Sequence, residues 1–228
     1  MAKNPTFLSA NLTILGHFNP AILTHNFLTE TCGFDELGEP VSQSPQELGV
    51  VSEVVYEKFR WFMDLNRMIV ENRVLGSLEE FTSPRFAVRY LDILPHTPVT
   101  VAGINLNVDF SISDPVTLWA RLGSPDDFVA SLKKFNASDV EISSHCRLSD
   151  KMFLLDHWSL SFNYTPDVRI SLQIIKDPAG QQVRTAFNHE WRNLKPQKEK
   201  LKQIAETYQD AAFMPFQLIE TILPEVIR

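Results

Sequence analysis

The segment from Val99 to Ile112, VTVAGINLNVDFSI, constrains the fold of this chain more than any other. Its even-numbered positions from 102 to 112 are all apolar, whereas its odd-numbered positions change from valine to asparagine, aspartate and serine after Gly103. Alternation of this kind is typical of a β-strand, because successive side chains point to opposite faces of a sheet. The valine-rich start should be buried on both faces, and past Gly103 one face should become polar. We therefore expect this strand to lie in the middle of a sheet.

The residues before this strand predict a β-α-β-β-α-β order. A first strand is expected at 11–18, and Asn19-Pro20 is a typical helix start that leads to a helix ending near residue 32. Alternating residues at 50–56 and 59–72 predict two or three strands, with a candidate turn at 64–67. Apolar residues at helical spacing predict a helix from Ser83-Pro84 to residue 94. With the central strand, this order corresponds to the ferredoxin-like arrangement.

The residues after the central strand predict a second antiparallel sheet region. Two short helices are expected after Asp114-Pro115 and Ser124-Pro125, and about four strands between 140 and 191 alternate apolar and polar residues. A final helix begins at Lys195-Pro196. We predict an α+β fold in one compact unit over 1–228. Its sub-halves are 1–113, which is ferredoxin-like, and 114–228, a meander, with helices packed on one sheet face.

Composition disfavours several classes of partner. The net charge is −7 and the isoelectric point is about 5.4, which opposes attraction to nucleic acid or to an anionic membrane. No segment approaches the ~18 apolar residues of a membrane span, and the N-terminus lacks the apolar core of a signal peptide. Cys32 and Cys146 form no CxxC pattern and are read as reduced, packed thiols. A cytoplasmic protein without a membrane association is therefore expected.

No motif in the sequence names a reaction. The GxxxxGK[ST], GxGxxG and GxSxG patterns are absent, and no two of the six histidines have HxH or HxxxH spacing. A zinc site across neighbouring strands could draw on His145, His157 and His189 with Cys146, but strand alternation puts His145 and Cys146 on opposite faces. His189 is in phase with apolar neighbours and is read as a partly buried histidine. We predict no catalytic residues, no metal site and no cofactor.

One polar face of the predicted sheet is the candidate binding surface, together with lysines of the last helix. The predicted binding residues are Asn105, Asn107, Asp109, His145, Arg147, His157, Arg169, Arg184, Lys198 and Lys202. The polar residues on the central strand form either the solvated side of a sheet or the floor of a site.

These features favour a non-catalytic interaction or regulatory protein. It is expected to self-associate through a sheet edge or an apolar helix face, as a homo-oligomer, and to bind a protein partner. One alternative is an enzyme whose site is assembled across strands around His157, with Asn105, Asp109 or Arg169. A second alternative is a nucleic-acid binder that uses the basic 184–202 region, although the net charge disfavours it.

The segment RFAVRYLDILPHTPVTVAGINLNVDF resembles part of an uncharacterised, sporadically distributed bacterial family of α+β proteins. In that family a helix precedes a strand that carries a Gly-x-x-x-Ile-Asn type run, whereas here Ile104 and Asn105 follow Gly103 directly. The residues that carry the resemblance here are Arg89, Tyr90, Gly103, Ile104 and Asn105. The function of the family is not established, so the resemblance implies a fold and no activity.

Overall fold

The computed structural model describes residues 5–44, 49–112, 114–122, 130, 132–149, 152–176 and 182–222. The strands are β1 (Thr6–Gly16), β2 (Ser42–Gln43), β3 (Val51–Val55), β4 (Phe59–Asp64), β5 (Arg67–Asn72), β6 (Val99–Ser111), β7 (Ser138–Ser149), β8 (Met152–Thr165), β9 (Val168–Lys176) and β10 (Gln182–Arg192). The α-helices are α1 (Ser83–Ile93), α2 (Pro115–Leu122) and α4 (Gln197–Ile222). None of the described helices is both long enough and apolar enough to span a membrane.

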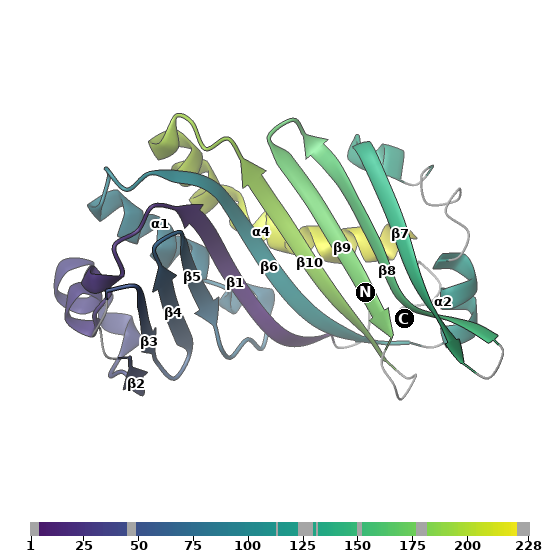
Figure 1. Ribbon diagram of the computed structural model, residues 1–228, viewed down its shortest axis with the longest axis horizontal. Coiled ribbons are helices and arrows are strands. Elements are labelled where there is room, and N and C mark those ends of the chain that lie inside the picture. Colours follow the sequence, from purple (N-terminus) through teal and green to yellow (C-terminus); the bar gives the residue numbers. More distant parts are fainter. Residues whose placement is uncertain are drawn as a thin grey trace. The chain divides into compact units, whose positions relative to one another are not determined.

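The strands form a single ten-stranded antiparallel sheet in the order β2-β3-β4-β5-β1-β6-β10-β9-β8-β7 (Figure 1). The strand predicted at 99–112 is β6, and its place in the middle of the strand order confirms the prediction. The chain divides into two compact units. One comprises Ser9–Asn105 and Glu190–Ala211 and is called the 9–105 unit; the other comprises Met1–Leu8, Leu106–His189 and Ala212–Arg228 and is called the 106–189 unit.

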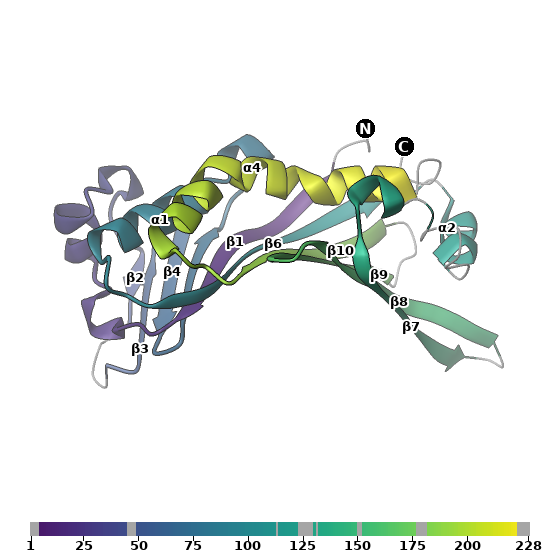
Figure 2. The same cartoon turned by 90° about the horizontal axis from the view of Figure 1, so that it is seen from above.

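In the 9–105 unit, β1, β3, β4 and β5 alternate strictly between a buried and a more exposed face. Trp61 on β4 lies opposite Val54 on β3 and Val70 on β5, and all three are fully buried. Helix α1 contributes Ala87, Tyr90 and Leu91 to this core, as its helical spacing predicts. Figure 2 shows α1 and the first part of α4 on the same side of these strands. The alternation in the sequence therefore determines which face the helices cover.

In the 106–189 unit, β7, β8 and β9 form a meander of long antiparallel strands. The register joins Trp158 to Ile174 and Leu160 to Leu172, and all four side chains are buried. Their neighbours in the chain, such as Ser159 and Ser161, are partly exposed. This confirms the predicted meander with one apolar and one polar face. On the apolar side, Phe216 of α4 packs edge to face on Phe110 of β6, with the ring centroids 5.6 Å apart.

The predicted ferredoxin-like order of the first half is wrong. Three consecutive antiparallel strands, β3, β4 and β5, stand where that order needs two, because the chain turns at Glu57-Lys58 as well as before β5. The segment at 20–32 is not an α-helix: a 3-10 turn over Pro20–Ile22 is followed by a π-helix over Phe27–Thr31. Asn19 caps the first turn as predicted, but the Thr24 hydroxyl then accepts the Phe27 N–H at 3.0 Å and starts a separate turn.

A close approach of two backbone segments makes Gly16 sensitive to substitution. A Cβ atom at Gly16 would lie 2.2 Å from the Pro98 carbonyl oxygen, which accepts the His17 N–H. We expect Gly16→Ala to lower the free energy of unfolding by about 1–3 kcal/mol, because both backbones must shift. At Gly76 a Cβ would lie 3.4 Å from the flexible Glu80 carboxylate, so Gly76→Ala should change stability by no more than about 0.5 kcal/mol. Urea denaturation measures both, and equal losses would contradict the steric explanation.

Candidate functional site

A network of polar side chains crosses the exposed face of the β7-β8-β9 meander. The Arg169 guanidinium on β9 donates to Glu141 Oε2 on β7 at 2.5 Å and to Ser161 Oγ on β8 at 2.6 Å. Ser161 Oγ also donates to Glu141 at 3.2 Å. Ser143 and Ser159 form a further cross-strand pair, with their hydroxyl oxygens 2.7 Å apart. The predicted polar face therefore carries a ladder of side chains that bind one another across strands.

Two of the predicted binding residues form a bidentate ion pair in the same unit. Arg184 Nε and Nη2 lie 3.0 and 3.1 Å from the two carboxylate oxygens of Asp109. The Asp109 side chain is only 12 % exposed, whereas that of Arg184 is 54 % exposed. A paired guanidinium and carboxylate largely cancel each other's charge at a distance. This part of the surface is therefore a weak attractor for a charged ligand.

The amides predicted on the central strand line none of the three cavities that the structure describes around residues 15–98. Asn105, in the 9–105 unit, donates from Nδ2 to Asn11 Oδ1 at 2.9 Å and to Thr13 Oγ1 at 3.2 Å. Asn107 belongs to the other unit and is half-buried on the face of Asp109. The bonds of Asn105 join β6 to β1, which makes it a cross-strand linker on the more exposed sheet face.

The histidines considered for a zinc site across strands, which the sequence disfavours, are placed only in part. The backbone of His145 lies directly opposite that of His157, whose side chain is half-buried. The side chains of His145 and Arg147 lie outside the described residues. The register changes by one residue after His145, so that Asp156 is an additional residue of β8. Within the described part of the chain, no three His, Cys, Asp or Glu side chains come close enough to bind a metal ion.

The basic 184–202 region contains acidic partners for several of its cations. Arg192 Nε lies 2.5 Å from Glu190 Oε1, and Lys202 Nζ lies 3.8 Å from Glu206 Oε1. Lys198 is exposed on α4. Lys198 and Lys202 belong to the 9–105 unit and Arg184 to the other. These acids were not considered in the prediction of a basic surface, and they lower its positive potential.

His189 is buried, with 5 % of its surface exposed, as its phase on the strand predicts. Burial lowers its pKa from 6.5 to about 4, because the charged imidazolium would lose its hydration. The side chain is therefore neutral at pH 7 and is part of the core of the 106–189 unit.

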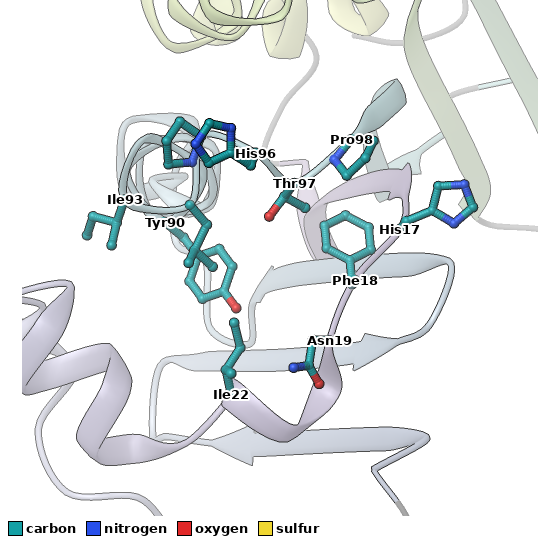
Figure 3. A pocket seen from close by; sticks show the side chains of 11 residues that line it. His17, Phe18, Asn19, Ile22, Tyr90, Ile93, His96, Thr97 and Pro98 are labelled. Atoms are coloured by element: carbon teal, nitrogen blue, oxygen red, sulfur yellow. The ribbon is translucent and has the colours of Figure 1, made fainter.

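A cavity of about 470 Å³ in the 9–105 unit is lined by residues that were not predicted as a site (Figure 3). Phe18, Ile22, Tyr90 and Ile93 form its apolar part, and His17 points away from them. Burial raises the pKa of the Tyr90 hydroxyl well above its ordinary value, so this group stays protonated and does not act as a base. The lining offers an apolar depression and no acid–base pair.

A larger cavity of about 700 Å³ is lined by other residues of α1, and it was also not predicted. Arg85 and Arg89 on α1 and Lys58 at the β3–β4 turn line it, together with Phe59 and Phe86. One feature of the sequence could have indicated this cavity. Arg85 and Arg89 are four residues apart, which places both on one face of a helix whose other face is buried.

The two edges of the sheet differ greatly in length. One edge strand, β2, has two residues, whereas the other, β7, has twelve. Neither a proline nor a lysine occurs in the sequence SDVEISSHCRLS of β7, although both residues commonly protect edge strands from pairing. Among the described strands, none pairs with the outer row of backbone N–H and C=O groups on β7.

No protein-family model matches the chain, and no curated protein matches it in sequence.

Proposed function

We propose that the protein acts by association, pairing with a second copy of itself through the β7 edge and binding a protein partner as that assembly. The single observation that carries the proposal is the twelve-residue edge strand that ends the sheet. In a strand of this length about every second residue, roughly six in all, directs its backbone N–H and C=O groups outward. Each hydrogen bond that these groups form with another strand contributes roughly 0.5–1.5 kcal/mol.

Pairing of β7 with its own copy is compatible with two-fold symmetry. Two identical strands can pair antiparallel about a two-fold axis, so that the same surface serves both copies and the assembly closes as a dimer. In the register centred on Ser144, the sequence places an acidic position, 141, opposite a basic one, 147, and Val140 opposite Leu148. Opposite charges and apolar pairs across strands favour such a register.

The polar ladder on the adjacent face supports this use of the edge. Glu141, Ser161 and Arg169 join three strands by side-chain hydrogen bonds, which holds the meander in a fixed form up to its edge. A preorganised edge pays less conformational entropy on pairing than a mobile one.

Proline substitutions on β7 test the proposal, with light scattering of the eluting protein as the measurement. We expect the wild-type chain to have twice its monomer mass of 26.0 kDa. Successive residues of a strand direct their N–H groups to opposite edges, so that either Ser143 or Ser144 has its N–H directed outward. Proline at the serine whose N–H points outward should give a monomer with nearly the wild-type melting temperature. Proline at the other serine should remove a hydrogen bond to β8 and lower the melting temperature.

Ser143→Ala and Ser144→Ala are the matched controls, because both keep the backbone N–H and change only exposed side chains. Both should remain dimeric. A monomeric wild type at micromolar concentration would sink the proposal, and so would dimers in both proline variants.

A further inference from the structure

The cavity beside α1 combines cationic and apolar groups in one place. Two guanidinium groups and the Lys58 ammonium line it against two carboxylates, Glu36 and Glu80, so its lining has a net positive charge in an acidic protein. Phe59 and Phe86 are each 8 % exposed at its wall. A volume of about 700 Å³ lies within the range of small-molecule sites, which is roughly 300–1,000 Å³.

Aromatic rings hold both guanidinium groups in place. Arg85 Cζ lies 5.6 Å from the ring centre of Tyr208, and Arg89 Cζ lies 5.2 Å from that of Phe34. A guanidinium that lies over a ring keeps its N–H groups in its own plane, where they remain available to a planar anion. The rings therefore fix the position of the charge without using its hydrogen-bond donors.

Gly33 gives Arg89 further room. A Cβ atom at Gly33 would lie 2.9 Å from Arg89 Nη2, and the glycine has φ +66°, a conformation that other residues rarely adopt. The backbone at Gly33 thus leaves space that the guanidinium occupies.

Neither guanidinium is matched by a protein anion. Among the described residues, no carboxylate lies within 4.0 Å of Arg85 or Arg89, and neither side chain donates a hydrogen bond to another described group. Elsewhere in the same unit, Arg60 and Arg67 both form ion pairs. The cavity thus places two guanidinium groups, neither with a carboxylate partner among the described residues, beside two largely buried phenylalanine rings.

We infer that this cavity binds a small organic carboxylate whose apolar ring or chain packs on Phe59 and Phe86 while Arg85 and Arg89 hold its carboxylate. Guanidinium and carboxylate match in geometry, because two parallel N–H groups can donate to the two oxygens. The cavity lies wholly in the 9–105 unit, so the inference is independent of association through β7, a strand of the other unit.

Calorimetric titration and saturation-transfer NMR with benzoate, octanoate, benzamide and inorganic phosphate test the site on the full chain. We expect both carboxylates to bind and benzamide and phosphate to bind at least roughly tenfold more weakly, because each lacks one of the two recognised features. Arg85→Gln and Arg89→Gln should each weaken benzoate binding by roughly tenfold or more.

Arg67→Gln is the matched control, since Arg67 also lies over an aromatic ring, that of Phe62, but lines a different part of the unit. It should bind benzoate as the wild type does, and melting temperatures should show that all three variants are folded. Equal binding of benzoate and benzamide, equal binding of phosphate, or an equal loss in Arg67→Gln would overturn the assignment.

Discussion

Replacing Trp61 with alanine is expected to lower the free energy of unfolding by about 3–5 kcal/mol, which is a large part of the stability of a typical domain. Trp61 has no exposed surface and lies in the centre of β4. Its ring stacks on Phe34 at 5.8 Å between centroids and tilts against Tyr90 at 5.6 Å. Removal of the indole would leave a cavity between a strand, a helix and the loop that carries Phe34, and these elements cannot close it together.

Urea denaturation followed by far-ultraviolet circular dichroism measures this loss, and Phe62→Ala is the matched control. Phe62 is the next residue of the same strand, but it is half-exposed on the opposite face, between Arg60 and Arg67. Its truncation should cost only about 1 kcal/mol, from the loss of two exposed cation–π contacts. Equal losses for the two variants would show that the face of β4 toward α1 is not the core of this unit.

Acid is expected to destabilise the protein through His189 between pH 6.5 and 4. Burial lowers the folded-state pKa of this histidine from 6.5 to about 4. Between these two values the unfolded chain binds a proton that the folded chain does not, so stability decreases as the pH falls through this interval. Its contribution is constant above about pH 6.5 and below about pH 4, and the full loss is about 3 kcal/mol.

The measurement is the free energy of unfolding in urea at several pH values from 7.5 to 3.5 for the wild type and for His189→Gln. Glutamine keeps hydrogen-bonding capacity and does not titrate, so the difference in slope between the two proteins isolates His189 from the carboxylates that also titrate in this range. The same pH dependence in both proteins would mean that folding does not lower the pKa of His189.

Much of the sheet could be predicted from the sequence, because its strands are long and bury only one of their two faces. Thirteen residues of β6 alternate almost without interruption, and the same holds for Trp158, Leu160 and Phe162 on β8. A period of two that continues for this length has no helical equivalent, so the pattern alone decides both the element and its buried face.

The order of the first half could not be predicted, because it depends on short turns. Asn19-Pro20 is a good helix start, but the Thr24 hydroxyl binds the Phe27 N–H and begins a new turn. One side-chain bond of this kind outweighs the weak preference of a single helical turn. The alternation between residues 50 and 72 is likewise compatible with two or three strands, and the turns before β4 and before β5 give three.

The predicted polar face exists, but its chemistry depends on pairings between strands that are far apart in the sequence. Arg184 and Asp109 were each predicted to bind a partner. In the structure they bind each other, although they lie 75 residues apart in the sequence. Arg85 and Arg89 were not named, because an exposed arginine on a helix is ordinary until the rings that hold it are known. The pairing of Arg184 with Asp109 depends on strand register, and the positions of Arg85 and Arg89 depend on ring contacts. Neither can be read from a single sequence.

Hydrogen exchange of the β7 backbone, followed by mass spectrometry at a high protein concentration and at one far below it, tests association through this edge most directly. We expect peptides from Ser138–Ser149 to exchange slowly at the high concentration and faster after dilution, because the outward N–H groups lose their partner strand. Peptides from β4, an interior strand of the sheet, should exchange at the same rate in both samples. Exchange of β7 that is fast and independent of concentration would contradict the proposal.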